Sequence, residues 1–175
     1  MDLRTDDTFQ YQIIPLLAER MKPSLYLEMG VRGGQCITRV APHAGRSIGV
    51  DLVWPGNTEG YEFFQCSTRE FIDSHLPKFR GIELCFIDAD HSASAVLNDF
   101  EGVLPFMADC GVIILHDTFP EEEWRTAPNE SGDCHKVASY IREHASEYNV
   151  EITTIPVPPG LSIIRCLGGE FIWMR

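Results

Sequence analysis

The sequence predicts an α/β protein with a mostly parallel sheet, and three features of the chain support this. Short apolar runs alternate with segments of helical length in five βα-like units. Two of these runs, Ile82–Ile87 and Val112–Leu115, flank a helical segment from Ser92 to about Met107, which is typical of parallel strands joined by a right-handed crossover. The chain then ends in two predicted strands, 150–155 and 161–166, whose connection is so short that they must be antiparallel.

Length and composition indicate one domain that spans residues 1–175. Hydrophobic residues make up 44% of the chain and charged residues 23%, as in soluble globular proteins. The net charge of −12 comes from 26 acidic and 14 basic residues. Such a surface repels phosphate backbones and anionic lipids, so we expect neither a nucleic acid nor a membrane among the partners.

Targeting signals and cysteine pairs are not evident in the sequence. No apolar run approaches the ~20 residues of a membrane span, and the first ten residues lack the features of a signal peptide, so we expect a cytoplasmic protein. Six cysteines are scattered without a C-x-x-C pair, which predicts neither a disulfide framework nor a zinc site. Cys85 and Cys166 lie in apolar runs and are expected to be buried thiols.

The remaining elements follow from apolar periodicity and from the positions of glycine and proline. Apolar residues at helical spacing predict a helix from Thr8 to Met21, although Pro15 leaves open whether this is one helix or two short ones. Thr68 is placed to cap the helix that follows it. The other expected strands are 24–29, 46–51 and 61–65, and the other expected helices are 35–41, 69–76 and 134–147.

A glycine-containing turn follows the first strand. Glu28, Gly30 and Gly34 fit the pattern E-x-G-x-x-x-G between a strand and a helix. Glycines there let the backbone approach a ligand closely, and the helix start offers free N–H groups to a negative group. A turn that is merely tight is the alternative. The dinucleotide fingerprint G-x-G-x-x-G is not met, because Arg32 occupies its second glycine position.

An acidic residue ends the next strand. Asp51 lies 21 residues after Gly30, close to the spacing of roughly 20 residues at which an acid binds a ribose diol. A solvated strand end is the alternative. The coupling to the glycine-containing turn favours ribose binding by Asp51.

Ionisable residues follow the strands at Ile82–Ile87 and Val112–Leu115. Asp88, Asp90 and His91 come directly after the first strand, and His116 and Asp117 after the second. The carboxyl ends of neighbouring parallel strands meet at one edge of the sheet, where ligands bind in open α/β folds. These residues therefore form the centre of the predicted site.

Two loops belong to the same edge of the predicted sheet. Cys66-Ser67-Thr68 lies where another loop of this edge is expected, which makes Ser67 a candidate cofactor contact. The segment Thr118–Asp133 is long for a compact domain, and such loops are usually functional. We expect it to act as a substrate gate.

Several motifs resemble those of class I S-adenosylmethionine-dependent methyltransferases. LEMGVRGGQC is similar to the first motif of this family, with Glu28, Gly30 and Gly34 as its acid and glycines, and IGVD is similar to the second, where Asp51 would hold both ribose hydroxyls. FIDADHSASAVLNDFEGVLPFMADCGVIILHDT resembles small bacterial methyltransferases related to metal-dependent O-methyltransferases, and GLSIIRC resembles their last strand. The resemblance covers roughly Leu25 to Cys166.

The resemblance implies a fold and an activity. The fold is a doubly wound, Rossmann-like, seven-stranded sheet, mostly parallel with a C-terminal antiparallel hairpin. The activity is transfer of a methyl group from S-adenosylmethionine to a small-molecule hydroxyl, with a sugar, a polyketide and a phenol as candidate acceptors in that order.

The same resemblance suggests roles at the centre of the site. Asp88 and Asp117 offer hard oxygen ligands suited to Mg²⁺, and their carboxylates are expected within about 5 Å of each other because the strands lie ~4.8 Å apart. The third ligand would be Thr118, as in catechol-type enzymes, or His116, as in the antibiotic-modifying branch. His91 is the candidate general base; a helix-start residue bonded to the backbone is the alternative. Asp88 is also a candidate catalytic residue and cofactor contact.

The chain departs from the family pattern at three places. Asp109-Cys110 stands where two glycines usually precede the fifth strand, His91 replaces a lysine of the catechol-type motif, and Asp117-Thr118 replaces Asp-Asn. These departures make the prediction of a metal less direct than that of the cofactor.

Two other classes of protein remain open at this level. A nucleotide- or dinucleotide-binding oxidoreductase domain would need a glycine at Arg32 and a second domain. The other is a catalytically silent binding module that keeps the cofactor fold, and the intact Asp51, Asp88, His91 and Asp117 speak against it. We also expect a homodimer, in which a neighbouring chain or the apolar tail Phe171–Met174 covers the acceptor pocket.

Overall fold

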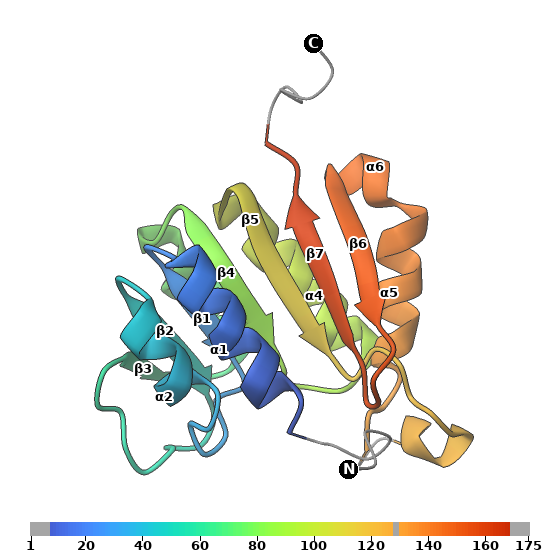
Figure 1. The fold of residues 1–175 in the computed structure, drawn as a ribbon, viewed down its shortest axis with the longest axis horizontal. Helices are drawn as coiled ribbons and strands as arrows, with labels where there is room; N and C mark the ends of the chain where they lie inside the picture. The colour runs from blue at the N-terminus through green and yellow to red at the C-terminus, as the bar shows by residue number, and fades with distance from the viewer. Residues whose placement is uncertain (1–7, 128–129, 169–175) are drawn as a thin grey trace.

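The computed structural model describes residues 8–127 and 130–168, which form a seven-stranded sheet with helices on both faces (Figure 1). The strands are β1 (Tyr26–Met29), β2 (Ser47–Asp51), β3 (Glu62–Gln65), β4 (Ile82–Ile87), β5 (Met107–His116), β6 (Val150–Ile155) and β7 (Leu161–Cys166). The α-helices are α1 (Gln10–Met21), α2 (Ile37–Val40), α3 (Thr68–Ser74), α4 (Ala93–Val103), α5 (Cys134–Glu143) and α6 (Ala145–Tyr148). Short 3-10 turns are η2 (Ala41–His43), η3 (Leu76–Lys78), η4 (Leu104–Phe106) and η5 (Glu123–Thr126).

The strand order places the switch point of the sheet between β1 and β4. The order is β3-β2-β1-β4-β5-β7-β6, and the first five strands of this order are parallel. β7 is antiparallel to both β5 and β6. Successive crossovers run outward from β1 to β3, and the chain then returns to the other side of β1 through β4. The carboxyl ends of β1 and β4 are therefore the place where a crevice opens in such a sheet.

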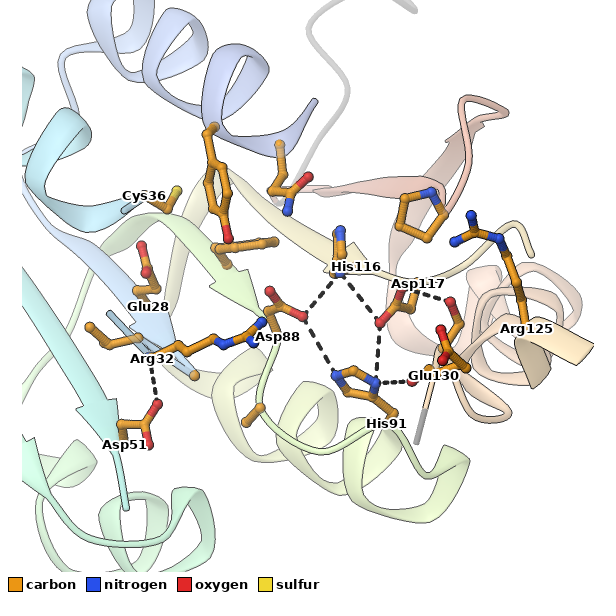
Figure 2. A pocket seen from close by; sticks show the side chains of 18 residues that line it. Glu28, Arg32, Cys36, Asp51, Asp88, His91, His116, Asp117, Arg125 and Glu130 are labelled. Atoms are coloured by element: carbon orange, nitrogen blue, oxygen red, sulfur yellow. Dashed lines mark hydrogen bonds and ion pairs between the residues drawn. The ribbon is translucent and has the colours of Figure 1, made fainter. Parts of the chain in front are cut away.

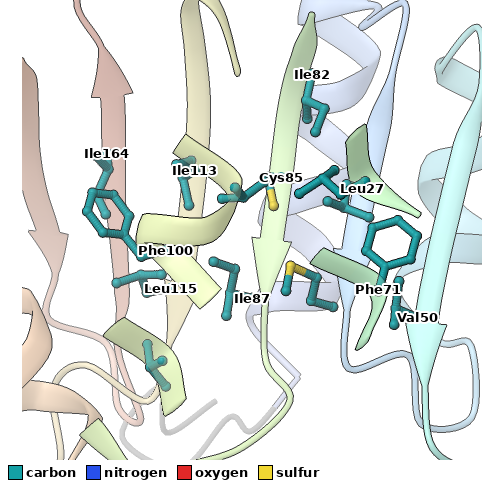
Figure 3. Close-up of a cluster of buried hydrophobic side chains, with 14 of the residues drawn as sticks. Leu27, Val50, Phe71, Ile82, Cys85, Ile87, Phe100, Ile113, Leu115 and Ile164 are labelled. Atoms are coloured by element: carbon teal, nitrogen blue, oxygen red, sulfur yellow. The ribbon is translucent and has the colours of Figure 1, made fainter. Parts of the chain in front are cut away.

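The core lies in two layers, one on each face of the sheet. Alternate residues of β4 divide between them: Cys85 and Ile87 join the layer that contains Phe71 of α3 and Phe100 of α4 (Figure 3), while Phe86 joins the layer beneath α1 and α2. A strand that is buried on both faces is apolar over most of its length. This explains the apolar runs in the central strands β4 and β5.

The predicted fold class is confirmed, and so are β4 and the C-terminal hairpin at the expected residues. The question left open at Pro15 is answered by one continuous helix, α1. Pro15 has no N–H to donate to the carbonyl of Tyr11, one turn earlier. That carbonyl instead accepts a hydrogen bond of 3.0 Å from Arg39 Nη1, so α2 supplies the partner that Pro15 lacks.

Some predicted boundaries are wrong. β5 begins at Met107 rather than Val112. Residues 107–111 also belong to the strand, its pairing with β4 shifts in register there, and Cys110 has φ +62°. The helix predicted from Cys134 to Glu147 is divided at His144 into α5 and α6. The cap of α3 is Ser67, not Thr68: the Ser67 hydroxyl accepts a hydrogen bond of 3.1 Å from the backbone N–H of Glu70.

Two further expectations concern the oligomeric state and a possible membrane span. The tail Phe171–Met174 lies outside the described residues, so the homodimer closed by this tail stays a prediction. Among the described helices, none is both long and apolar enough to cross a membrane.

Candidate active site

A cavity of about 490 Å³ opens at the carboxyl ends of β1, β4 and β5 (Figure 2). It brings together most of the residues predicted from the sequence: Glu28, Gly30, Asp51, Asp88, His91, His116 and Asp117. Three others, Gly34, Ser67 and Thr118, are not among its lining residues. Residues at the ends of separate strands therefore share one site, as expected for neighbouring parallel strands.

Gly30 is required by the close packing of the turn after β1 against the end of β4. Its backbone has φ +95°, and a Cβ atom built on it would lie 2.1 Å from the carbonyl oxygen of Asp88. The N–H of Asp88 donates to the carbonyl of Met29 at 2.8 Å, which fixes the two strand ends side by side. Any side chain at Gly30 would push Asp88 away from its place in the cavity.

Asp51 is held in a defined orientation by backbone donors. Oδ2 accepts a hydrogen bond of 2.7 Å from the N–H of Arg32, and Oδ1 accepts one of 2.9 Å from the N–H of Val53. Arg32, with φ +50°, is part of the glycine-containing turn, so this turn and the end of β2 are joined directly. Each carboxylate oxygen keeps acceptor capacity for a second donor such as a ligand hydroxyl.

Glu28 lines the cavity from β1 but is otherwise enclosed. Its side chain is 1% exposed, and Oε2 accepts a hydrogen bond of 2.6 Å from the hydroxyl of Tyr26. That hydroxyl also lies 3.6 Å from the sulfur of Cys36. Burial raises the pKa of Glu28 from 4.5 to about 8, although the Tyr26 hydrogen bond acts in the opposite direction. At pH 7 the protonated, neutral form of Glu28 therefore predominates.

An acidic and histidine cluster forms the other end of the cavity. The ring nitrogen Nδ1 of His116 lies 3.0 Å from Asp88 Oδ1 and 3.4 Å from Asp117 Oδ2. One ligand atom from each of these three side chains lies within 4.8 Å of the other two, which agrees with the expected approach of the carboxylates. His91, at the start of α4, closes the cluster with Nδ1 at 3.4 Å from Asp117 Oδ2 (Figure 2).

Within the cluster, the pKa values of His116 and Asp117 are shifted in opposite directions. Burial opposes a charge on His116, but the carboxylates of Asp88 and Asp117 outweigh it and raise the pKa of His116 to about 10. Asp117 is also buried, yet the pKa of its carboxyl is lowered because His116, the Ser131 hydroxyl and His91 surround it. Neither ring nitrogen of His116 makes a hydrogen bond of good geometry with a described residue. The pair of acids is thus compensated by a positive charge rather than by directed bonds.

The same donor set fits a divalent cation. The carboxylates of Asp88 and Asp117 lie close together in a partly buried site, where their mutual repulsion has to be offset by positive charge. Their oxygens are hard ligands, and the imidazole nitrogen of His116 between them has no directed partner among the described residues.

The sequence matches the profile of a known protein family. The profile of a family described as "Methyltransferase domain" matches residues 27–118, which is more than half of the chain. The chain belongs to this methyltransferase family. The predicted relationship with class I S-adenosylmethionine-dependent methyltransferases is thereby confirmed, and the oxidoreductase and silent-module alternatives are set aside.

Solved structures are similar to this methyltransferase over nearly its whole length. An O-methyltransferase from Bacillus cereus in complex with S-adenosylhomocysteine has a TM-score of 0.74 at 19% identity, with 93% of this chain and 83% of that chain covered. The O-methyltransferase TomG from Streptomyces achromogenes, involved in tomaymycin synthesis and bound to S-adenosylmethionine, has a TM-score of 0.70 at 16% identity, with coverage of 94% and 82%. At these identities the likeness concerns the fold. No curated protein matches the chain.

Two predicted contacts of the methyltransferase site have structural partners elsewhere. Thr118 is buried, and its hydroxyl accepts a hydrogen bond of 2.9 Å from the hydroxyl of Ser162 on β7. Ser67 caps α3. In this structure neither reaches the cavity, so of the four candidate metal ligands three are brought together.

Other residues of the methyltransferase cavity were missed by the sequence analysis. They are Gln10 and Tyr11 from α1, Arg125, Glu130 and Ser131 from the β5–α5 loop, and Pro159 from the β6–β7 link. The length of the loop predicts that it lies near the substrate, but nothing in its composition indicates which residues face the cavity. The start of α1 carries no signal, because it reaches the site only by packing across β1 and β4.

Proposed function

We propose that this methyltransferase binds S-adenosylmethionine in the cavity between the glycine-containing turn and Asp51 and methylates a hydroxyl oxygen of a small-molecule acceptor. The observation that carries the proposal is the single cavity that joins Asp51 to the cluster of Asp88, His91, His116 and Asp117. One end offers acceptors for a ribose diol, and the other offers groups that activate a hydroxyl.

Three features support the cofactor assignment. Asp51 faces the cavity with its orientation fixed by two backbone donors. Gly30 lets the turn after β1 pack directly against the backbone of Asp88 at the switch point of the sheet, which brings this turn and Asp88 to the same cavity. Glu28, neutral and buried beside the cavity, is suited to a ligand that carries positive charge, because such a charge would stabilise its ionised form. The Bacillus and Streptomyces relatives are bound to S-adenosylhomocysteine and S-adenosylmethionine.

Transfer of a methyl group to a hydroxyl has two requirements. The sulfonium of S-adenosylmethionine supplies an electrophilic methyl group, so the protein must align the acceptor oxygen with it. The acceptor hydroxyl must also lose its proton, and His91, partly exposed on the cavity wall, is the proposed base. Asp88, at the centre of the cavity, orients the acceptor and shares in the charge that develops there.

We propose Asp88, Asp117 and His116 as the ligands of a divalent metal, Mg²⁺ by the hardness of the two carboxylates. Such an ion would lower the pKa of the acceptor hydroxyl. Thr118 is not part of this proposed set, because its hydroxyl is engaged by Ser162.

The acceptor end of the cavity favours a polar molecule. Gln10, Tyr11, Arg125, Glu130 and Ser131 line it, and together they offer both hydrogen-bond donors and acceptors. This supports a sugar hydroxyl as the first acceptor class to test, ahead of a polyketide or a phenol. The polar wall is less suited to a flat hydrophobic ring.

Binding and turnover test the proposal in two steps. Calorimetric titration should show saturable binding of S-adenosylmethionine and S-adenosylhomocysteine and none of NAD. Turnover with methyl-labelled S-adenosylmethionine and a panel of glycosides, polyketides and phenols should then label one class on oxygen. Binding of NAD without S-adenosylmethionine would overturn the cofactor assignment, and labelling of a nitrogen or carbon acceptor alone would overturn the O-methylation.

A further inference from the structure

The last turn of the β5–α5 loop, residues 130–133, is bound to the start of α4. The N–H of Asp133 donates to the carbonyl of His91 at 3.1 Å, and Asp133 Oδ1 accepts a hydrogen bond of 2.6 Å from the N–H of Ala93. The sulfur of Cys134 also donates to the His91 carbonyl, at 3.3 Å. The backbone that directly follows the His91 side chain is therefore held by this segment.

The 130–133 segment also contacts the acidic cluster. The hydroxyl of Ser131, which is buried, donates to Asp117 Oδ1 at 2.8 Å. Gly132 has φ +56°, and a Cβ atom built on it would lie 2.1 Å from the carbonyl oxygen of His91. The segment lies so close to His91 that no side chain fits between them.

The two nitrogens of the His91 ring have different surroundings. Nδ1 lies next to hydrogen-bond acceptors, whereas Nε2 lies toward the cavity. Nδ1 is within hydrogen-bond distance of the carbonyl oxygen of Glu130 and lies 3.4 Å from Asp117 Oδ2 (Figure 2). A carbonyl oxygen can only accept a hydrogen bond, so in the contact with Glu130 the nitrogen has to be the donor. Nδ1 must therefore carry the proton.

The other nitrogen is left as the acceptor. Nε2 has Asp88 Oδ1 as its near neighbour, and the distance of 4.0 Å is too long for a direct hydrogen bond. In a neutral ring with its proton on Nδ1, the lone pair is on Nε2. A partner on one nitrogen generally sets the protonation of the other in this way.

We propose that residues 130–133 position His91 for catalysis: the Glu130 carbonyl holds the ring in the tautomer with the proton on Nδ1, so that Nε2 accepts the proton of the substrate. The catalytic part of this inference rests on the proposed function. In the transfer step the O–H bond of the acceptor breaks toward Nε2, and an oxygen–methyl bond forms. The sulfur–methyl bond breaks with its electron pair left on sulfur, which turns a sulfonium into a neutral thioether and leaves the charge on His91.

The tautomer can be measured directly by NMR on protein labelled with ¹⁵N in its histidines. Spectra at alkaline pH are compared with those of His91→Gln, which lacks the His91 ring signals. In the wild type we expect a protonated Nδ1 and an unprotonated Nε2. A ring protonated on Nε2 would overturn the inference, whatever the activity.

Gly132→Ala tests whether the segment sets the tautomer. The new methyl group displaces residues 130–133 from His91, so the proton should shift to Nε2 in a large share of molecules and kcat should fall by about tenfold or more, with the Kd for S-adenosylmethionine unchanged. Gly81→Ala is the matched control: Gly81 also has positive φ, at +72°, but has no atom within 4 Å of a built Cβ. Gly81→Ala should keep the wild-type tautomer and kcat.

A second pair of variants keeps the test valid if Gly132→Ala does not fold. Asp133→Ala removes the acceptor for the Ala93 N–H and should change the tautomer, whereas Asp133→Asn keeps an oxygen acceptor and should restore the wild-type spectrum. If kcat falls in Gly132→Ala or Asp133→Ala while Nδ1 stays protonated, the positioning role is refuted. If the wild type has the expected tautomer but methylates no acceptor, the proposed function fails and the assignment of the tautomer stands.

Discussion

Replacement of Glu28 by Gln tests the consequence of a buried carboxyl beside the cofactor cavity. Gln has nearly the same size, and its carbonyl can still accept the hydrogen bond of the Tyr26 hydroxyl, but it cannot ionise. Burial raises the pKa of Glu28 from 4.5 to about 8 in the folded protein. Between these values the folded carboxyl keeps its proton while the unfolded one is ionised, so folding takes up a proton and the free energy of unfolding falls as pH rises.

The size of the effect follows from the width of this window. Each pH unit between the two pKa values lowers the free energy of unfolding by ~1.4 kcal/mol. Over the window from 4.5 to about 8 this amounts to roughly 5 kcal/mol, which is a large part of the stability of an ordinary domain. Without ligand, Glu28→Gln should therefore match the wild type near pH 4.5 and become progressively more stable as pH rises to about 8.

The assay is urea unfolding of both proteins at pH 5, 6, 7 and 8, with unchanged m-values as the check on two-state behaviour. The difference in unfolding free energy should grow by about 1.4 kcal/mol per pH unit, and by less as the pH approaches 8. Glu121→Gln, at an exposed position of the β5–α5 loop, is the control and should run parallel to the wild type. Parallel curves for Glu28→Gln and the wild type would refute the reasoning, because they would mean that Glu28 is ionised in the fold.

Three further predictions concern the site. Asp51→Ala should weaken S-adenosylmethionine binding by roughly 1.5–3 kcal/mol, because ligand hydroxyls lose a charged acceptor; an unchanged calorimetric Kd in folded protein would remove Asp51 from the site. Gly30→Val should abolish binding and lower Tm, because its side chain would collide with the Asp88 backbone; a wild-type Kd would contradict this. EDTA should abolish methyl transfer, Mg²⁺ or Mn²⁺ should restore it, and Asp117→Asn should cost far more activity than His116→Gln. Activity unchanged by chelation would instead leave His91 to act as a base without a metal.

The fold and the centre of the site were determined by the sequence to a large extent. Apolar runs mark strands buried on both faces, and the polar residues that end them must meet at one edge because parallel strands share a direction. Asp51, Asp88 and Asp117 could therefore be assigned to one site from their positions in the sequence alone. Gly30 could be singled out as well, as a glycine that lets a ligand approach; in the structure it makes room for the backbone of Asp88.

The tertiary structure decided what depends on contacts between distant segments. Pro15 does not divide α1, because Arg39 from α2 reaches the carbonyl that Pro15 leaves unpaired. Thr118 follows Asp117 directly, yet its hydroxyl is engaged by Ser162 on β7 rather than by the cavity. His91 Nδ1 lies within hydrogen-bond distance of the Glu130 carbonyl, which is 39 residues away along the chain. Local sequence specifies periodicity and turn chemistry, whereas the partner of each polar group depends on how the elements pack, and that is fixed only by the whole fold.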